Sequence, residues 1–148
     1  DIFHQPCDVN ALATAALYHD ASEILTGDLP TPIKYHNAEI MSAYHAVEDL
    51  AVQKLLGMLP PELRETYADV LAEDKNGDIY PLVKAADKLS AYIKCIEERK
   101  AGNNEFLSAE AQTRAALEAS PLPEVQYFLE HFIPAFERDL DELGAIGQ

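Results

Sequence analysis

Residues 17–32 read LYHDASEILTGDLPTP, and this stretch decides the fold and the chemistry that we expect. It follows an apolar, alanine-rich run, places His19 next to Asp20, and puts Glu23 three residues after that aspartate. On a helix, Asp20 and Glu23 lie on neighbouring turns of one face, and His19 is rotated from Asp20 by roughly 100°. An imidazole beside a carboxylate is a common pair of ligands for a divalent transition metal. A nearby acid that is not itself a ligand is what metal-assisted hydrolysis uses to position water.

The same pair also fits a purely structural interpretation, because a histidine on an apolar helix is usually a hydrogen-bonded core residue. Two features favour the metal site. First, the neighbours of the pair are apolar: Ala15, Ala16, Leu17, Ile24 and Leu25. They predict a buried setting, in which an unpaired carboxylate is costly. Second, Asp87 also lies inside an apolar helical run. Two carboxylates and an imidazole in apolar surroundings favour a bound cation.

The composition predicts one globular domain and a small-molecule partner. Of the 148 residues, 48% are hydrophobic and 25% charged, which argues against disorder. The net charge is −15, from 26 acidic and 11 basic residues. Such a surface repels nucleic-acid polymers and anionic membranes, both of which bind basic patches, so we expect neither as a partner. A phosphate ligand should be small and needs a local cation to overcome the unfavourable field.

The apolar runs, the first residues and the cysteines indicate where in the cell the protein works. No run is apolar for long enough to cross a bilayer, and the first residues lack the pattern of a secretory signal. Cys7 and Cys95 are far apart and match neither a metal-site spacing nor a disulfide framework. The expected localisation is the reducing cytoplasm.

Apolar spacing, capping residues and breakers predict an all-α fold of about six helices. Asp8 or Asn10 caps the first helix, which carries His19 and bends near Glu23, and the last helix is kinked at Pro134. The later helices are expected at about 38–58, 62–72, 81–100, 106–119 and 124–143. The turn between the third and fourth helices falls on Asp74–Asp78.

After the first helix, Gly27 is free to take positive φ, and Asp28–Pro32 is expected to be a stiff, extended loop. Such a loop beside a site can hold a ligand in one pose, although a simple helix-stopping turn is the alternative. His36 and His45 do not share a helix face with each other, and we interpret both as non-ligands. One late segment is strongly aromatic and is expected to form core or a subunit contact: Tyr127, Phe128, Phe132, Ile133 and Phe136.

Four strings in the chain resemble those of the bacterial HD-domain 5′-deoxynucleotidases, which remove phosphate from deoxynucleoside 5′-monophosphates. The strings are YHDASE (residues 18–23), TGDLPTP (26–32), AD (86–87) and AGNNEF (101–106). A His-Asp pair with a distant Asp is a weak signature alone, but the longer strings are specific. The similarity extends from about Asn10 to the C-terminal helix.

The resemblance implies an all-helical HD-domain bundle that spans residues 1–148, forms a homodimer and uses a divalent transition metal. Cobalt or manganese is implied, with copper or zinc as alternatives. Carried across by motif, the metal ligands are His19, Asp20 and Asp87, and Glu23 is the acid that handles the attacking water. The substrate-binding residues implied by the same motifs are Asp20, Asp28, Leu29, Pro30, Thr31 and Asp87.

The front of the chain departs from the family pattern. The family has a further ligating His, and an Arg and a Trp near the phosphate and sugar, on a segment that precedes the pair. His4 is the sole His before the pair in this sequence, and its neighbours resemble a loop between helices, so we do not assign it as that ligand. We expect the N-terminal part of the domain to exist in the full protein and to be missing from this chain.

Three other functions stay open at this point. One is an HD hydrolase with another phosphate substrate, such as a cyclic nucleotide or a guanosine alarmone. Another is a non-catalytic HD module that binds nucleotide, although the presence of Glu23 argues against it, because a sensor needs metal ligands at most. The third is a structural helical bundle, in which Lys or Arg neighbours would have to satisfy the acids.

Overall fold

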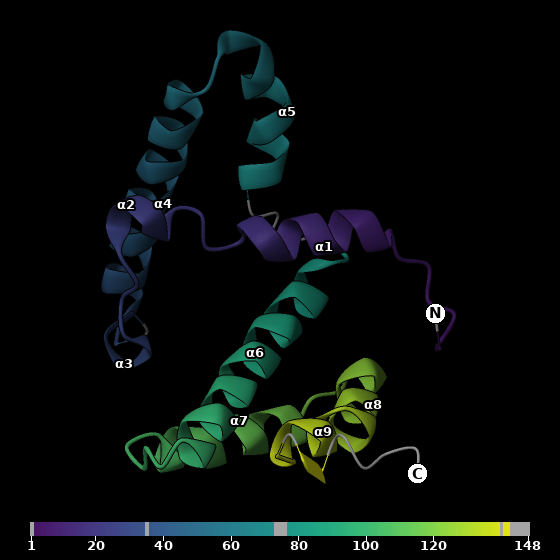
Figure 1. Ribbon diagram of the computed structural model, residues 1–148. Helices are drawn as coiled ribbons and strands as arrows, with labels where there is room; N and C mark the ends of the chain where they lie inside the picture. Colours follow the sequence, from purple (N-terminus) through teal and green to yellow (C-terminus); the bar gives the residue numbers. More distant parts are fainter. Residues whose placement is uncertain (1, 35, 73–76, 140, 143–148) are drawn as a thin grey trace. The chain divides into compact units, whose positions relative to one another are not determined.

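The computed structural model describes residues 2–34, 36–72, 77–139 and 141–142, without the side chains of Thr31 and Pro32. All regular structure in these ranges is helical, so the all-α prediction is confirmed (Figure 1). The helices are α1 (Val9–Tyr18), α2 (Glu23–Thr26), α3 (Thr31–Lys34), α4 (Ala38–Met58), α5 (Pro61–Leu71), α6 (Tyr80–Lys100), α7 (Leu107–Glu118), α8 (Pro123–His131) and α9 (Ile133–Glu137).

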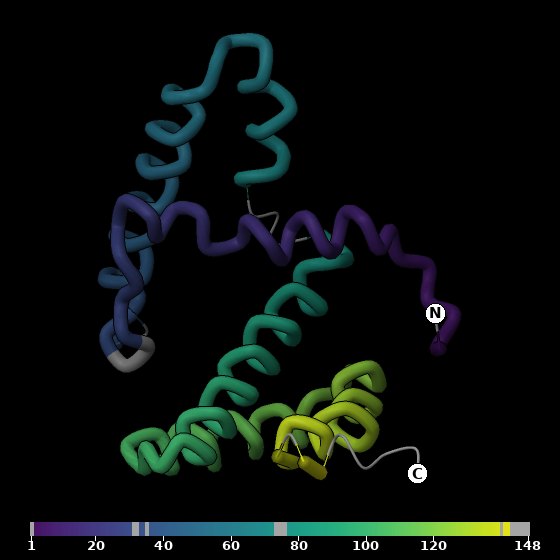
Figure 2. Tube along the Cα trace, viewed as in Figure 1, coloured from purple at the N-terminus to yellow at the C-terminus, as the bar shows by residue number. Residues whose placement is uncertain are grey.

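The chain forms two compact units, one of Cys7–Val83 and one of Asp1–Pro6 with Lys84–Gln148. In the Cys7–Val83 unit, α1 packs against α5, and α2, α3 and α5 all pack against α4. Figure 2 follows the chain of this unit from α1 through the short α2 and α3 into α4. The candidate site residues from His19 to Pro30 therefore lie where the chain turns from one long helix to the next.

Capping residues explain where two of the long helices begin. The Asp8 carboxylate accepts hydrogen bonds from the amides of Asn10 and Ala11 at 2.9 and 3.0 Å, and so starts α1. The Asn37 side chain accepts from the amide of Ile40 at 2.8 Å and starts α4. Of the two caps predicted as alternatives for the first helix, the structure has Asp8. The six longer helices match the six expected ones to within a few residues, except at the two ends described next.

The first helix ends at Tyr18, earlier than predicted. Beyond it the amide of Ala21 bonds to the Tyr18 carbonyl and that of Glu23 to the Asp20 carbonyl, both at 2.9 Å. These three-residue spacings make tight turns in place of a continuing α-helix. They still put Glu23 one turn after Asp20, as the sequence indicated. Gly27 has φ +69°, the left-handed conformation expected there.

The proline-rich segment is non-helical from Gly27 to Pro30, but α3 begins at Thr31, so the prediction of an extended loop through Pro32 was wrong. The amides of Ile33 and Lys34 bond to the Pro30 carbonyl at 2.8 and 3.0 Å. Pro32 is tolerated in this first turn because an amide there has no helical partner to lose. The turn predicted at Asp74–Asp78 lies outside the described residues as far as Asn76.

A cluster of buried hydrophobic side chains lies in the unit that contains Lys84–Gln148. Its buried side chains are Tyr92, Ile96, Leu117, Val125 and Ile133. The chain breaks at Phe132 between α8 and α9, and α9 ends at Glu137, so the predicted single kinked helix to about 143 was wrong. Within the aromatic segment, Ile133 is buried, while the Phe132 and Phe136 side chains are 49% and 36% exposed. Val125, which precedes that segment on α8, is also buried.

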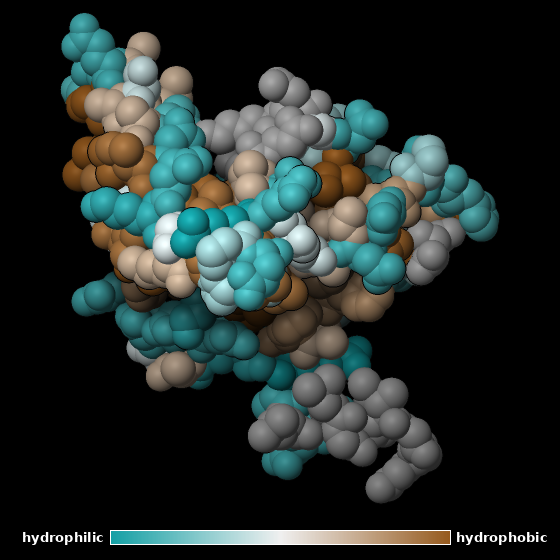
Figure 3. All heavy atoms as spheres, turned by 90° about the horizontal axis from the view of Figure 1, so that it is seen from above, coloured by the Kyte–Doolittle hydropathy of each residue, from teal (hydrophilic) through white to brown (hydrophobic). Residues whose placement is uncertain are grey.

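The predicted burial of the apolar residues around the His-Asp pair was also wrong. Leu17 is 82% exposed and Ile24 is 76% exposed, while Ala15 and Ala16 are half-buried. They are apolar neighbours of the pair in sequence, but the described residues leave Leu17 and Ile24 largely uncovered. Hydrophobic side chains reach the surface elsewhere too, as the brown areas on the face drawn in Figure 3 illustrate. No helix in the described ranges combines the length and apolarity needed to span a membrane.

Candidate metal centre

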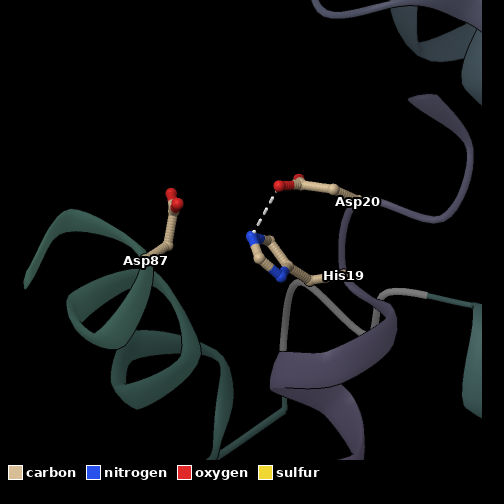
Figure 4. Close-up of side chains that lie close together, drawn as sticks. All are labelled: His19, Asp20 and Asp87. Carbon is tan, nitrogen blue, oxygen red and sulfur yellow. Dashed lines mark ion pairs between the residues drawn. The ribbon is translucent and has the colours of Figure 1, made fainter. Parts of the chain in front are cut away.

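The His19–Asp20 pair is held at the carboxyl end of α1. The His19 ring is mostly buried, and its Nδ1 lies 2.8 Å from the Ala16 carbonyl oxygen. Because a carbonyl can only accept, Nδ1 carries a proton and donates it to this bond. In the neutral ring, Nε2 then presents a lone pair, and it lies 3.0 Å from Oδ2 of Asp20, as the dashed line in Figure 4 marks.

This geometry suits a cation. A neutral Nε2 and an ionised carboxylate are both acceptors, so their 3.0 Å approach is favourable when a proton or a metal ion is shared between them. A backbone carbonyl that fixes the ring through its other nitrogen is also the usual outer partner of a metal-binding histidine. The imidazole and carboxylate atoms of the pair therefore fit two ligands of a divalent transition metal.

The two carboxylates are more exposed than expected. The Asp20 side chain is 53% exposed, and Asp87, drawn in Figure 4 on α6, is exposed as well. The expectation that both acids sit in apolar surroundings was therefore wrong, because the apolar neighbours in sequence point to other faces or to solvent. The case for a cation rests instead on the orientation of the His19 ring against Asp20.

Glu23 lies in a cluster of acids. Burial raises the pKa of its carboxyl, the charges of Asp20 and then Asp28 raise it further, and Lys34 partly opposes them. A carboxyl whose pKa is raised toward neutrality is better suited to accept a proton from water than an ordinary surface glutamate. The electrostatic setting of Glu23 thus fits the role of a base beside a metal.

The raised pKa predicts a pH-dependent stability for the metal-free chain. The protonated form of Glu23 is favoured by folding, so its contribution is fully present below the unfolded pKa and is lost as pH rises through the folded pKa. Glu23→Gln cannot ionise and keeps its contribution. In buffer with chelator, we expect the thermal unfolding midpoint of this variant to rise relative to that of the wild type as the pH is increased from 4 to 7.

The control is Glu65→Gln, which removes one exposed acid of α5 and so reports the effect of net charge alone. If the midpoint differences from the wild type grow equally with pH in both variants, the effect comes from net charge and not from the environment of Glu23.

The loop residues implied by the resemblance come next in the chain, after α2 and Gly27. Asp28 and Pro30 are exposed, Leu29 is half-buried, and the Thr31 side chain lies outside the described structure. Two residues that the sequence did not single out contact the ends of this loop: the Tyr44 hydroxyl donates to the Gly27 carbonyl at 3.2 Å, and Glu48 pairs with Lys34 at 3.1 Å. No sequence signal marked them, because both contacts join positions that are distant along the chain.

A cavity of about 290 Å³ adjoins the His19 ring within the Cys7–Val83 unit. Its walls come from α1, the end of α5 and the start of α6, and they are mostly apolar. The lining residues are Ala11, Thr14, Ala15, Tyr18, His19, Asp69, Val70, Leu71, Ala72, Ile79, Tyr80 and Val83. Its volume is at the lower end of the range for small-molecule pockets.

Known proteins resemble the chain over most of its length. Two relatives called 5′-deoxynucleotidase YfbR, from Shigella flexneri serotype 5b (strain 8401) and Escherichia coli (strain K12 / DH10B), are each 52% identical over 140 residues, which cover 93% of this chain and 70% of the relative. A solved HD-domain phosphohydrolase from Listeria innocua is 26% identical, with a TM-score of 0.75, over 91% of this chain and 66% of that one.

The solved neighbour agrees with an HD-domain helical fold, as the sequence motifs implied. The family model described as 5′-deoxynucleotidase YfbR-like matches residues 1–136, from the first residue through almost all of α9. The matched region includes the His19–Asp20 pair, Glu23, the loop after Gly27 and Asp87. The chain therefore belongs to the 5′-deoxynucleotidase YfbR-like family.

Proposed function

We propose that this protein is a metal-dependent phosphomonoesterase that hydrolyses deoxyribonucleoside 5′-monophosphates to deoxynucleoside and phosphate. The observation that carries the proposal is the 52% identity, over 93% of the chain, to relatives called 5′-deoxynucleotidase. The site is consistent with it, because a His-Asp pair oriented for a cation lies one turn before an acid of raised pKa.

The proposed metal ligands are His19, Asp20 and Asp87. The hydrogen bond from Nδ1 of His19 to Ala16 orients Nε2 toward Asp20, and the two exposed carboxylates supply hard anionic oxygens. This mixed donor set suits cobalt or manganese, with copper or zinc as alternatives. When bound, the ion lowers the pKa of a coordinated water and neutralises part of the phosphate charge.

The other roles fall to residues on the turn and the loop after it. Glu23 orients the attacking water and accepts its proton as the water oxygen bonds to phosphorus. The bond from phosphorus to the 5′ oxygen then breaks, and that oxygen takes up a proton from solvent to become the 5′-hydroxyl of the deoxynucleoside. Asp20 and Asp87 border the phosphate, and Asp28 accepts a hydrogen bond from the sugar 3′-hydroxyl. Leu29, Pro30 and Thr31 keep the loop close to the sugar, where an added 2′-hydroxyl has no room. This arrangement accounts for a preference for deoxyribose.

We further propose that the protein acts in the cytoplasm as a homodimer. Cys7 and Cys95 are both free thiols, which suits a reducing compartment. Exposed apolar side chains on both compact units leave surface for a subunit contact, among them Leu50, Met58 and Phe132.

The test is a panel of phosphate esters assayed with added Co²⁺ or Mn²⁺. We expect phosphate release from deoxyribonucleoside 5′-monophosphates, and much less from the matching ribonucleotides, from 3′-monophosphates and from cyclic nucleotides. Faster release from a cyclic nucleotide or a guanosine alarmone would assign a different HD hydrolase. Binding of deoxynucleotide without phosphate release would indicate a sensor.

A further inference from the structure

The loop that carries the proposed sugar-binding residues is fastened at both ends to one face of α4. At its start, the Tyr44 hydroxyl donates a hydrogen bond to the Gly27 carbonyl at 3.2 Å. Beyond its other end, on the short helix α3, the Lys34 ammonium pairs with Oε1 of Glu48 at 3.1 Å. Tyr44 and Glu48 are four residues apart on α4 and therefore lie on the same face, one turn apart.

The two fastenings support each other. The Lys34 ammonium lies 4.5 Å from the centre of the Tyr44 ring, where a cation is attracted to the aromatic face. The other carboxylate oxygen of Glu48 is 2.8 Å from Nδ1 of His45, so both of its oxygens are engaged. The Lys34 and Glu48 side chains are each only 19% exposed, so solvent screens this ion pair less than a surface pair.

The loop has little means of holding its own shape. The helices on either side of it, α2 and α3, have four residues each, which is too short for a helix to be stable by itself. By contrast α4 has 21 residues, and α2, α3 and α5 all pack against it. The position of the loop of residues 28–30, and of α3 after it, is thus set by the contacts that join them to α4.

Gly27 links this fastening to the catalytic acid. Its amide donates to the Glu23 carbonyl at 2.9 Å, while its own carbonyl accepts from Tyr44. Gly27 also takes the left-handed conformation that turns the chain into the loop. A movement at the Tyr44 contact is therefore transmitted to the start of the sugar-binding loop on one side and to the backbone of Glu23 on the other.

We propose that Tyr44 and Glu48 are positioning residues that hold the loop of residues 28–30, and α3 after it, at a fixed distance from Glu23, and that this distance sets the preference for deoxyribose over ribose. The inference rests on the proposed function. It adds two residues on α4 that touch neither metal nor substrate, and it makes the sugar selectivity depend on their contacts with Gly27 and Lys34.

Two conservative substitutions test it. Tyr44→Phe keeps the ring beneath Lys34 and removes only the hydroxyl, and Glu48→Gln keeps the shape and removes the charge. We expect the ratio of kcat/KM for a deoxynucleotide to that for its ribonucleotide to fall about fivefold and about tenfold, respectively, because a neutral and a charged hydrogen bond are lost. The change should appear as a raised KM for the deoxynucleotide, with metal content unaltered.

Matched controls make the same chemical changes elsewhere. Tyr67→Phe removes a hydroxyl from α5, and Glu118→Gln removes one partner of the exposed Arg114 pair on α7. Both should leave the sugar ratio as in the wild type. A purely structural effect of the α4 variants would lower the rates for both sugars alike and leave the ratio unchanged, which would overturn the proposed role.

Hydrogen exchange of the amides in residues 27–34, without substrate, separates this inference from the proposed function. Faster exchange in both α4 variants, together with the fall in the sugar ratio, supports it. Unchanged exchange would contradict the claim that Tyr44 and Glu48 hold the loop in place. Faster exchange with an unchanged sugar ratio would contradict their role in selectivity. If the wild type releases no phosphate from any deoxynucleotide, the proposed function and the selectivity role are both wrong. The exchange measurement still tests whether Tyr44 and Glu48 hold the loop in place.

Discussion

Glu23→Gln is expected to retain the metal and to lower kcat by about 100- to 10,000-fold, the range that positioned proton transfer contributes. Glutamine has nearly the same shape as glutamate and can still hold a water by hydrogen bonding, but it cannot accept its proton. Since Glu23 is not a proposed ligand, metal content should stay at the wild-type level. Elemental analysis of the purified protein and phosphate release under saturating deoxynucleotide measure the two quantities.

The environment of Glu23 adds a pH signature. Burial and the charges of Asp20 and Asp28 raise the pKa of this carboxyl, so the fraction of ionised base falls as pH is lowered into the acid range. Activity of the wild type should therefore decline on the acid side, and the residual activity of Glu23→Gln should lose that limb. Full activity in this variant would assign the water-handling role to another residue, and loss of metal would make Glu23 a ligand.

Asp87→Asn is expected to weaken metal binding by at least about 100-fold, the upper end of what removing an outer partner of a ligand costs. The substitution keeps the size of the side chain and removes the negative charge that a divalent ion requires. Activity should fall in parallel with metal content and should recover in part when excess metal is added. Isothermal titration of the metal-free protein with Co²⁺ or Mn²⁺ measures the affinity directly.

The control for Asp87→Asn is Glu97→Gln, which removes one exposed acid from the same helix ten positions later. It reports how much of any change comes from the lower net charge of a protein at −15. Wild-type metal affinity in Asp87→Asn would leave His19 and Asp20 as the ligands from this chain and would remove Asp87 from the site.

Features that depend on near neighbours in sequence were predicted well. Asp8 and Asn37 are caps because their side chains reach amides two or three residues away, and Gly27 takes positive φ because it directly follows a helix. The His-Asp-x-x-Glu spacing likewise survived the early end of α1, since tight turns keep Glu23 one turn after Asp20.

Features that depend on what packs over a surface were not predictable in the same way. Leu17 and Ile24 were expected to be buried because they are apolar neighbours of the His-Asp pair, but the sequence does not say what covers them, and both are exposed in the described structure. The fastening of the loop by Tyr44 and Glu48 also escaped the sequence, because it joins residues 14 and 17 positions apart. The raised pKa of Glu23 depends on the same folded arrangement of acids.

Because α1 stops at Tyr18, its carboxyl end faces the His19–Asp20 pair. The peptide dipoles of a helix sum to a partial negative charge at that end, which favours a neighbouring cation by about 0.3–1 kcal/mol at an exposed site. Had the helix run on to Glu23, this negative pole would have lain a full turn beyond the two proposed ligands. The early stop thus lets the backbone itself add to the attraction that the side chains exert on a metal ion.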